Sequence, residues 1–316
     1  MGFAYYVHDL SPFLVEFGNG IGVRWYGLAY LAAFWVAWLV LVQFSRQGFC
    51  EIPVAKLGDF VLWLGMFGVI LGGRLGYMLL YDFHGWMSDP MSIFRVWDGG
   101  MASHGGITGV ALYSLWYARR HHISWRGLGD NLVVVAPVGL FFGRIANFIN
   151  GELYGRPAQV PWAVKFPQEI RTLPYGVQDR IVEGAAALNP NWNSVPVIEV
   201  AVRSEPELRE FVGGILPPRH PSQIYEGVLE GLVLFGVLWV LRTRVRVRDG
   251  VLTGLFFISY AVLRIAGEMF REPDAPLTGP FTRGQFLSLF LIIVGIGFLW
   301  SAKRSPSWAP AWRKSS

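Results

Sequence analysis

Cysteine and charge are both scarce in this sequence. Its 316 residues include a single cysteine, Cys50, and only 16% are charged, whereas about 25% is usual for soluble domains. One cysteine excludes an internal disulfide framework and a metal site built from several cysteines. The adjacent His121 and His122 cannot face one ligand together on a helix, and no other Cys/His spacing typical of a metal site is present. The sequence therefore predicts no metal site.

Long apolar runs are abundant instead. Hydrophobic residues make up 53% of the chain, and the mean hydropathy is +0.39. A helix of roughly 20 apolar residues can cross a membrane, and we identify seven such runs: 25–44, 59–80, 103–118, 131–150, 223–241, 250–268 and 285–302. The first run is too long for the apolar part of a signal peptide, so we expect it to be retained. The predicted fold class is an all-α polytopic membrane protein with about seven transmembrane helices.

Basic residues are distributed unevenly among the loops. One side receives Arg46 and Lys56, the cluster Arg119, Arg120 and Arg126, the segment RTRVRVR (242–248), and the tail with Lys303, Arg304, Arg313 and Lys314. Short cytoplasmic loops are enriched in Lys and Arg, so we predict the N-terminus outside and the C-terminus in the cytoplasm. The basic residues in these loops account for the net charge of +5. We therefore do not interpret this charge as a nucleic-acid-binding surface.

The predicted organisation is one integral membrane domain with an extramembrane insertion. Residues 1–150 hold the first four spans, 151–220 form a small extracytoplasmic head region, 221–302 hold the last three spans, and 303–316 form a basic cytoplasmic tail. Two stretches of the head region, VPWAVKFP (160–167) and VPVIEVAV (195–202), have the composition of β-strands.

Three arginines lie inside predicted spans, where a charge is costly. Arg74 has Tyr77 and Tyr81 on its helix face, Arg144 is followed by Asn147, and Arg264 lies one turn from Tyr260 and from Glu268. Such arginines can extend to the interface or pair internally to hold helices together. Because all three lie late in outward-running spans, we favour a shared cavity at one depth. Guanidinium groups match phosphate geometry, so an anionic lipid headgroup or a transported anion would fit there.

Two polar segments lie at the starts of the third and fifth predicted spans, both on the outer side of the membrane. WDGGMASHGG (97–106) contains His104, an ordinary side chain that can take a proton near neutral pH. HPSQIYE (220–226) brings His220, Gln223, Tyr225 and Glu226. For His104 a structural hydrogen bond is the alternative to catalysis, and for the second segment helix-start chemistry is the alternative to a role in the cavity.

Several segments, in order along nearly the whole chain, resemble one known family. They are RWYGLAYL (24–31), LGGRLGY, FRVWDGGMASHGG, GRIANFINGELYGRP (143–157), RHPSQIYE and YAVLRIAGEMFREPD. In these motifs the chain is similar to prolipoprotein diacylglyceryl transferase, an enzyme of the bacterial inner membrane. The match to residues 158–217 and to the C-terminal tail is weak.

The resemblance implies an activity and a set of site residues. The family transfers the diacylglyceryl group of phosphatidylglycerol to the lipobox cysteine of a preprolipoprotein, leaving a thioether and glycerol 1-phosphate, without a cofactor. Its essential positions correspond to these residues: Tyr26, His104, Arg144, Asn147, Glu152, Gly155, Arg264 and Glu268. Arg74, Tyr260 and Glu226 are further candidates. The implied catalytic residues are Tyr26, His104, Arg144, Asn147 and Arg264, and the implied phosphatidylglycerol-binding residues are Arg74, Arg144, Glu152, Gly155, Tyr260, Arg264 and Glu268.

Three other function classes are alternatives to a transferase. An anion or lipid transporter would also place arginines inside spans, but it gives no reason for the Gly-His and NGE motifs. An intramembrane protease would need a Ser/His pair, paired aspartates or a zinc-binding helix in the spans, and the predicted spans contain none. A purely structural bundle gains nothing from three buried arginines.

Overall fold

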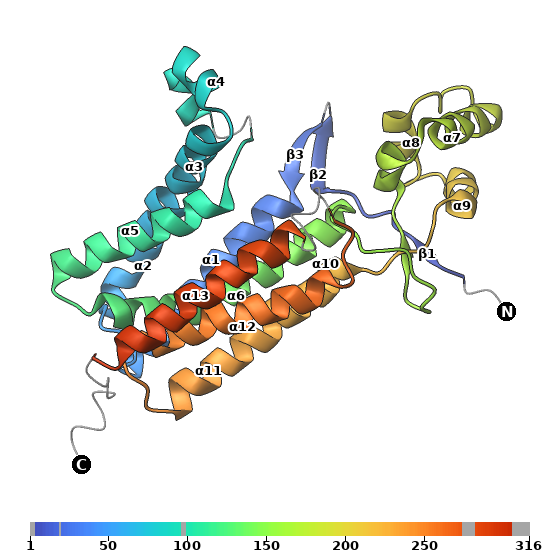
Figure 1. Cartoon of the computed structure of the whole chain (residues 1–316). Helices are drawn as coiled ribbons and strands as arrows, with labels where there is room; N and C mark the ends of the chain where they lie inside the picture. The colour runs from blue at the N-terminus through green and yellow to red at the C-terminus, as the bar shows by residue number, and fades with distance from the viewer. Residues whose placement is uncertain (1–3, 19, 96–98, 274–281, 305–316) are drawn as a thin grey trace. The chain divides into compact units, whose positions relative to one another are not determined.

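The computed structural model describes residues 4–18, 20–95, 99–273 and 282–304 (Figure 1). Most of these residues are helical. Residues 97 and 98 of the glycine-rich segment and the predicted basic tail from residue 305 onward lie outside the described residues.

Six helices in the described part of the chain are long and apolar enough to cross a membrane: Trp25–Arg46, Val54–Leu80, Trp125–Asn150, Ser222–Arg244, Val251–Glu268 and Gly284–Ala302. They confirm six of the seven predicted spans. The remaining one corresponds to α5 (Ser103–His121), a helix of 19 residues that three glycines and a basic end make less apolar. Its crossing of the membrane stays a prediction, and so do the orientation and the domain boundaries.

The chain divides into two compact units, each assembled from separate stretches. Unit 1 comprises residues 1–32, 139–234 and 259–291, and unit 2 comprises 33–138, 235–258 and 292–316. Several spanning helices contribute residues to both units, namely α1 (Trp25–Arg46), α6 (Trp125–Asn150), α12 (Val251–Glu268) and α13 (Arg283–Ala302).

In unit 2, a helix pair packs through glycines. The second span consists of α2 (Val54–Trp63), the π-helical η1 (Leu64–Leu71) and α3 (Gly72–Leu80), and α5 lies beside it. A Cβ atom on Gly105 of α5 would lie 2.3 Å from the carbonyl oxygen of Gly72 and 2.7 Å from the Cα of Gly76. Only glycine permits backbones to approach this closely, as in other membrane helix pairs. Two short helices follow α3, α4 (Phe83–Ser88) and the 3₁₀ helix η2 (Pro90–Phe94).

Buried polar groups anchor the loops at one end of unit 2. The fully buried Asp130 accepts hydrogen bonds from the backbone N–H groups of Gly250 and Thr253, each at 2.8 Å, where α12 begins. Asn131 accepts from Nε of Arg242, at the end of α11 (Leu234–Arg244), at 3.0 Å, and donates to the carbonyl of Phe49 at 3.1 Å. Pairing of this kind offsets the cost of burying polar groups.

The head region of unit 1 is helical and has its own core. The helices η4 (Pro167–Thr172), α7 (Tyr175–Leu188), α8 (Val195–Ala201) and α9 (Pro206–Ile215) surround a set of buried side chains: Ile170, Ile181, Ala185, Trp192, Ile198, Val202, Leu208, Val212 and Leu216. The predicted strand at 195–202 is therefore wrong. Ile198 and Val202 are both fully buried, and their spacing of four is helical. In addition, Pro196 sits in the first turn of α8, where proline is tolerated.

Strands are few among the described residues. Of the predicted strand at 160–167, only Val164–Lys165 (β4) forms a strand, and it pairs in parallel with β1 (Tyr6–Val7). Strands β2 (Phe13–Gly18) and β3 (Ile21–Arg24) form an antiparallel hairpin that leads directly into α1. The chain of unit 1 then continues through α6, the head region, α10 (Ser222–Glu226) and the π-helical η5 (Gly227–Val233).

Candidate active site

A tight turn at the end of α6 brings three predicted site residues together. Gly151 and Leu153 both have positive φ, +71° and +58°, so the chain reverses immediately after the helix. The carboxylate of Glu152 thereby returns to Asn147 and accepts a hydrogen bond from its Nδ2 at 2.8 Å. The same Nδ2 donates to the hydroxyl of Tyr26, on α1, at 2.7 Å. Tyr26, Asn147 and Glu152 thus form one hydrogen-bonded group.

The start of α10 holds this turn in place. Nε2 of Gln223 donates to the carbonyl of Glu152 at 2.7 Å, and the hydroxyl of Ser222 donates to that of Leu153 at 3.0 Å. Nδ1 of His220 lies 3.2 Å from the hydroxyl of Tyr225, and burial lowers the pKa of His220. The segment 220–226 begins a helix, α10 (Ser222–Glu226), and its role in a cavity stays a prediction.

Gly155 lies where three segments cross. A Cβ atom there would lie 2.5 Å from the carbonyl oxygen of Phe270 and 2.6 Å from that of His220. The backbone N–H of Gly155 donates to His220, and that of Arg156 donates to Phe270, each at 2.9 Å. We conclude that glycine is required at this position by backbone packing, whatever else it contacts.

Six charged side chains form an ion-pair cluster next to this turn. Arg144 on α6 pairs with Glu226 at 3.0 Å and with Glu230 at 3.4 Å. Arg264 on α12 pairs with Glu226 at 2.8 Å, with Glu230 at 3.4 Å and with Glu268 at 2.6 Å. Arg271 pairs with Glu226 at 3.4 Å. We use the name ion-pair cluster for these six residues: Arg144, Glu226, Glu230, Arg264, Glu268 and Arg271.

Burial within the cluster is unequal. The side chains of Glu226 and Glu230 are fully buried, whereas those of Arg144 and Arg264 keep 14% and 13% of their surface exposed. With three arginines and three glutamates, the cluster is neutral when all are ionised. Buried carboxylates cannot be left unpaired without a large cost, which the arginines offset. A guanidinium group carries several N–H donors in a fixed fork, so the exposed parts of Arg144 and Arg264 can also bind an anion.

Helix geometry explains how the cluster assembles. Glu226 and Glu230 are four residues apart across the beginning of η5, and Arg264 and Glu268 are four apart on α12, so each pair shares a helix face. The π-helical turn η5 is the kind of irregularity that often accompanies functional sites. Gly231 allows η5 to approach α6, since a Cβ atom there would lie 2.9 Å from the Cα of Phe141.

The remaining predicted residues are Tyr260, His104 and Arg74. Tyr260 is half-buried on α12, one turn before Arg264. His104 and Arg74 belong to unit 2. His104 is exposed in the first turn of α5. Arg74 is buried and donates to the carbonyls of Gly99, of Gly100 at 3.2 Å and of Ser92 at 2.6 Å, so it braces the loop that precedes His104.

Sequence reasoning did not single out two members of the cluster, Glu230 and Arg271. A signal for Glu230 was present, because it follows Glu226 by four residues within an otherwise apolar run. No local signal connected Arg271 to Glu226, which is 45 residues away in the chain.

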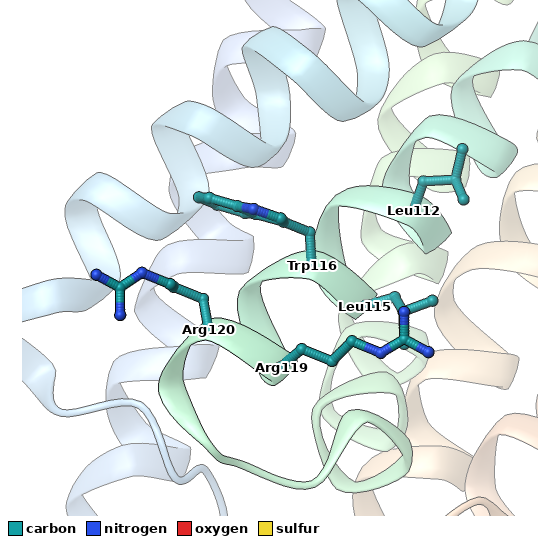
Figure 2. Close-up of a pocket in the computed structure, with 5 residues that line it drawn as sticks. All are labelled: Leu112, Leu115, Trp116, Arg119 and Arg120. Atoms are coloured by element: carbon teal, nitrogen blue, oxygen red, sulfur yellow. The ribbon is translucent and has the colours of Figure 1, made fainter.

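A pocket on α5 in unit 2 is lined by Leu112, Leu115, Trp116, Arg119 and Arg120 (Figure 2), and none of these five is a predicted site residue. Within the described residues, no three His, Cys, Asp or Glu side chains are grouped so that they could hold a metal ion.

The fold and the site define a class: a polytopic membrane protein with buried, internally paired arginines and glutamates. Residues 12–301 match the family described as prolipoprotein diacylglyceryl transferase, and the chain belongs to that family. It is similar to proteins named phosphatidylglycerol--prolipoprotein diacylglyceryl transferase from three bacteria. It is 39% identical to that of Xylella fastidiosa strain 9a5c, over 96% of this chain and 97% of the relative. The protein of Rhodospirillum centenum is 40% identical, over 96% of this chain and 95% of the relative. That of Coxiella burnetii is 38% identical, over 95% of this chain and 98% of the relative.

Proposed function

We propose that this protein transfers the diacylglyceryl group of phosphatidylglycerol to the lipobox cysteine of preprolipoproteins in the bacterial inner membrane, the first step of lipoprotein maturation. The relatives' names state this reaction class. The observation in the chain itself that supports it best is the ion-pair cluster, in which two arginines with partly exposed side chains pair with fully buried carboxylates.

The reaction exchanges one bond for another. The cysteine sulfur of the acceptor attacks the carbon of the diacylglycerol unit that is bonded to the phosphate oxygen. A C–S bond forms, and the C–O bond between that carbon and the phosphate oxygen breaks. The bonding pair leaves with oxygen as glycerol 1-phosphate, and the thiol proton passes to a base or to the released phosphate. Negative charge therefore grows on the phosphate group during the reaction, and preorganised donors at that position lower the barrier.

Arg144 and Arg264 are the side chains that we assign to the phosphate. Their carboxylate partners fix each guanidinium fork before substrate arrives, which avoids reorganisation during the reaction. Arg264 contacts three carboxylates and Arg144 contacts two. Glu226, Glu230 and Glu268 thus act as positioning residues.

The group formed by Tyr26, Asn147 and Glu152 is suited to the uncharged part of the headgroup. Its hydroxyl, amide and carboxylate offer both donors and acceptors, which glycerol hydroxyls require. An ordinary thiol has a pKa of about 8.5 and needs a base or a positive field to react at neutral pH. We propose His104 as that base, with the arginine field as the alternative.

The proposal is tested by incubating the purified protein with phosphatidylglycerol and a lipobox peptide. Mass spectrometry should detect a peptide heavier by one diacylglyceryl group, and the product should be absent with Arg144→Ala. If folded protein binds anionic lipid but yields no adduct, the transporter interpretation is favoured instead.

The role of His104 has its own test. His104→Gln should lose turnover, with the deficit shrinking as the pH rises toward the thiol pKa, because a free thiolate then replaces the one formed by the base. Near-normal turnover of the variant across pH would assign thiol activation to the arginine field.

A further inference from the structure

The β2–β3 hairpin of unit 1 exposes apolar side chains on both strands. Leu14 and Val15 on β2 are 49% and 47% exposed, Phe17 is 74% exposed, and Ile21 and Val23 on β3 are 68% and 40% exposed. Apolar residues that cluster in this way usually mark an interaction surface.

The hairpin also exposes unpaired backbone. Its sheet has only two strands within the described residues, so each strand keeps one outer edge of N–H and C=O groups. Such an edge is a template for a further strand. In a lipid hydrocarbon environment these groups would stay unsatisfied, which is costly, and Glu16 on β2 is exposed as well. An extended peptide satisfies both the backbone edge and the apolar side chains, whereas lipid satisfies only the latter.

The hairpin leads directly to the candidate active site. The backbone N–H of Trp25 donates to the carbonyl of Pro12 at 3.0 Å and closes the base of the hairpin. Strand β3 ends at Arg24, two residues before Tyr26, whose hydroxyl bonds to Asn147. Two residues of backbone, about 7 Å, therefore separate the end of β3 from Tyr26.

Resting on the proposed function, we propose that the β2–β3 hairpin is the docking surface for the protein substrate and binds the apolar segment before the lipobox cysteine by strand addition. A signal peptide carries an apolar run followed by small residues, which matches the apolar hairpin. Main-chain pairing supplies affinity without a demand for a particular sequence, as an enzyme with many protein substrates requires. Docking along β3 delivers the cysteine to the Tyr26 end of the site.

Direct binding tests the proposal independently of catalysis. A fluorescent lipobox peptide is titrated with purified wild-type protein and with Val15→Ser/Val23→Ser, which alters a cross-strand pair of the hairpin. We expect peptide binding to weaken about tenfold in the variant, because two partly exposed apolar contacts are lost. The matched control is Val197→Ser/Val200→Ser on α8 of the head region, where the two valines are 39% and 61% exposed, and it should bind like wild type.

Two additional measurements separate strand pairing from other roles. A peptide with N-methyl groups at alternate positions before the cysteine should bind wild type several-fold more weakly, since it cannot pair as a strand. Val15→Thr/Val23→Thr, which preserves β-branching, should fold normally and show an intermediate loss. In the transferase assay the hairpin variants should raise KM for the peptide and leave kcat and KM for phosphatidylglycerol unchanged.

Several outcomes would overturn the proposal. Unchanged peptide affinity in the serine variant, or an equal loss in the control variant on α8, would remove the hairpin as the docking surface. A change in KM for phosphatidylglycerol alone would assign the hairpin to lipid. A wild-type dimer that dissociates in the variant, with peptide affinity unaltered, would assign it to a second copy of the chain. A wild-type protein that binds peptide through the hairpin but forms no product would refute the proposed function and not the docking.

Discussion

Among single residues, Arg144 pairs with two fully buried carboxylates and keeps 14% of its side-chain surface exposed. Replacing it with lysine keeps the charge but loses the fork that holds a carboxylate and a phosphate together. We expect Arg144→Lys to lower kcat by about 100-fold, the loss typical of one transition-state donor, with KM for the peptide unchanged. Initial rates at saturating phosphatidylglycerol measure this, and a near-wild-type rate would show that only charge matters.

Glu230 should contribute mainly to stability and preorganisation. Glu230→Gln leaves guanidinium charge uncompensated in a buried setting, which costs about 3 kcal/mol of folding free energy. Thermal unfolding in detergent measures the loss. Glu272→Gln is the control, because Glu272 is 45% exposed in its pair with Arg219, and exposed pairs contribute under about 1 kcal/mol. Equal unfolding temperatures for the two variants would contradict a special role for Glu230.

His8 should make the stability of unit 1 depend on pH. It is buried against the rings of Phe148 and Phe166, with centroids 5.6 and 5.5 Å away. Burial lowers the pKa of His8 below its ordinary value of 6.5, Asp9 opposes this shift and Arg203 adds to it. The unfolded chain therefore binds the proton more readily, and the stabilisation present above pH 6.5 is lost as the pH falls below it.

His8→Phe should remove this dependence. Unfolding temperatures of wild type and variant, compared between pH 7.5 and 5.5, provide the measurement. Wild type should lose stability toward pH 5.5 more steeply than the variant, and parallel curves would mean that His8 does not titrate with unfolding.

The sequence singled out candidate residues, but it specified few of their contacts. The pair Arg264 and Glu268 could be read from their helical spacing. The contacts of Arg144 with Glu226 and Glu230 join residues more than 80 positions apart, and no local pattern encodes such a contact. The structure contains internal ion pairs of Arg144 and Arg264, whereas the shared cavity that we favoured stays a prediction.

At the level of helices and strands, apolar length was a sufficient guide to six spans, because hydrocarbon thickness sets one physical criterion. The prediction from residue composition was wrong for residues 195–202. Their Val and Ile content suggested a strand, but burial of one helical face against α7 and η4 outweighs intrinsic β-propensity. Composition decides an element only where tertiary packing does not.

Packing of α5 against α3 depends on glycine at one position and tolerates alanine at the next. Gly105→Ala would place a methyl group 2.3 Å from the carbonyl oxygen of Gly72, whereas at Gly106 the nearest atom is 3.7 Å away. We expect Gly105→Ala to cost about 1–3 kcal/mol, as overpacking does, and to lower activity by displacing the helix that carries His104. Gly106→Ala should behave like wild type. Similar melting temperatures for both variants would show that the helix pair can separate freely.

For the whole molecule, the outstanding prediction is the orientation in the membrane, which rests on loop charge. The protein itself supplies a clean background for labelling, because Cys50 is buried and burial raises its pKa to about 11. At neutral pH this thiol is almost entirely protonated and inaccessible, so we expect that a maleimide does not react with it. A single introduced cysteine then reports one location.

Two positions distinguish the two orientations. Tyr175 in the head region is 83% exposed, and Arg246 lies exposed between α11 and α12. In intact cells, a membrane-impermeant maleimide should label Tyr175→Cys but not Arg246→Cys, and the latter should react only after permeabilisation. The reverse pattern would place the head region in the cytoplasm. There it could not meet a substrate that emerges on the outer side, and the positive charge of the loops would need a different explanation, such as attraction of an anionic partner.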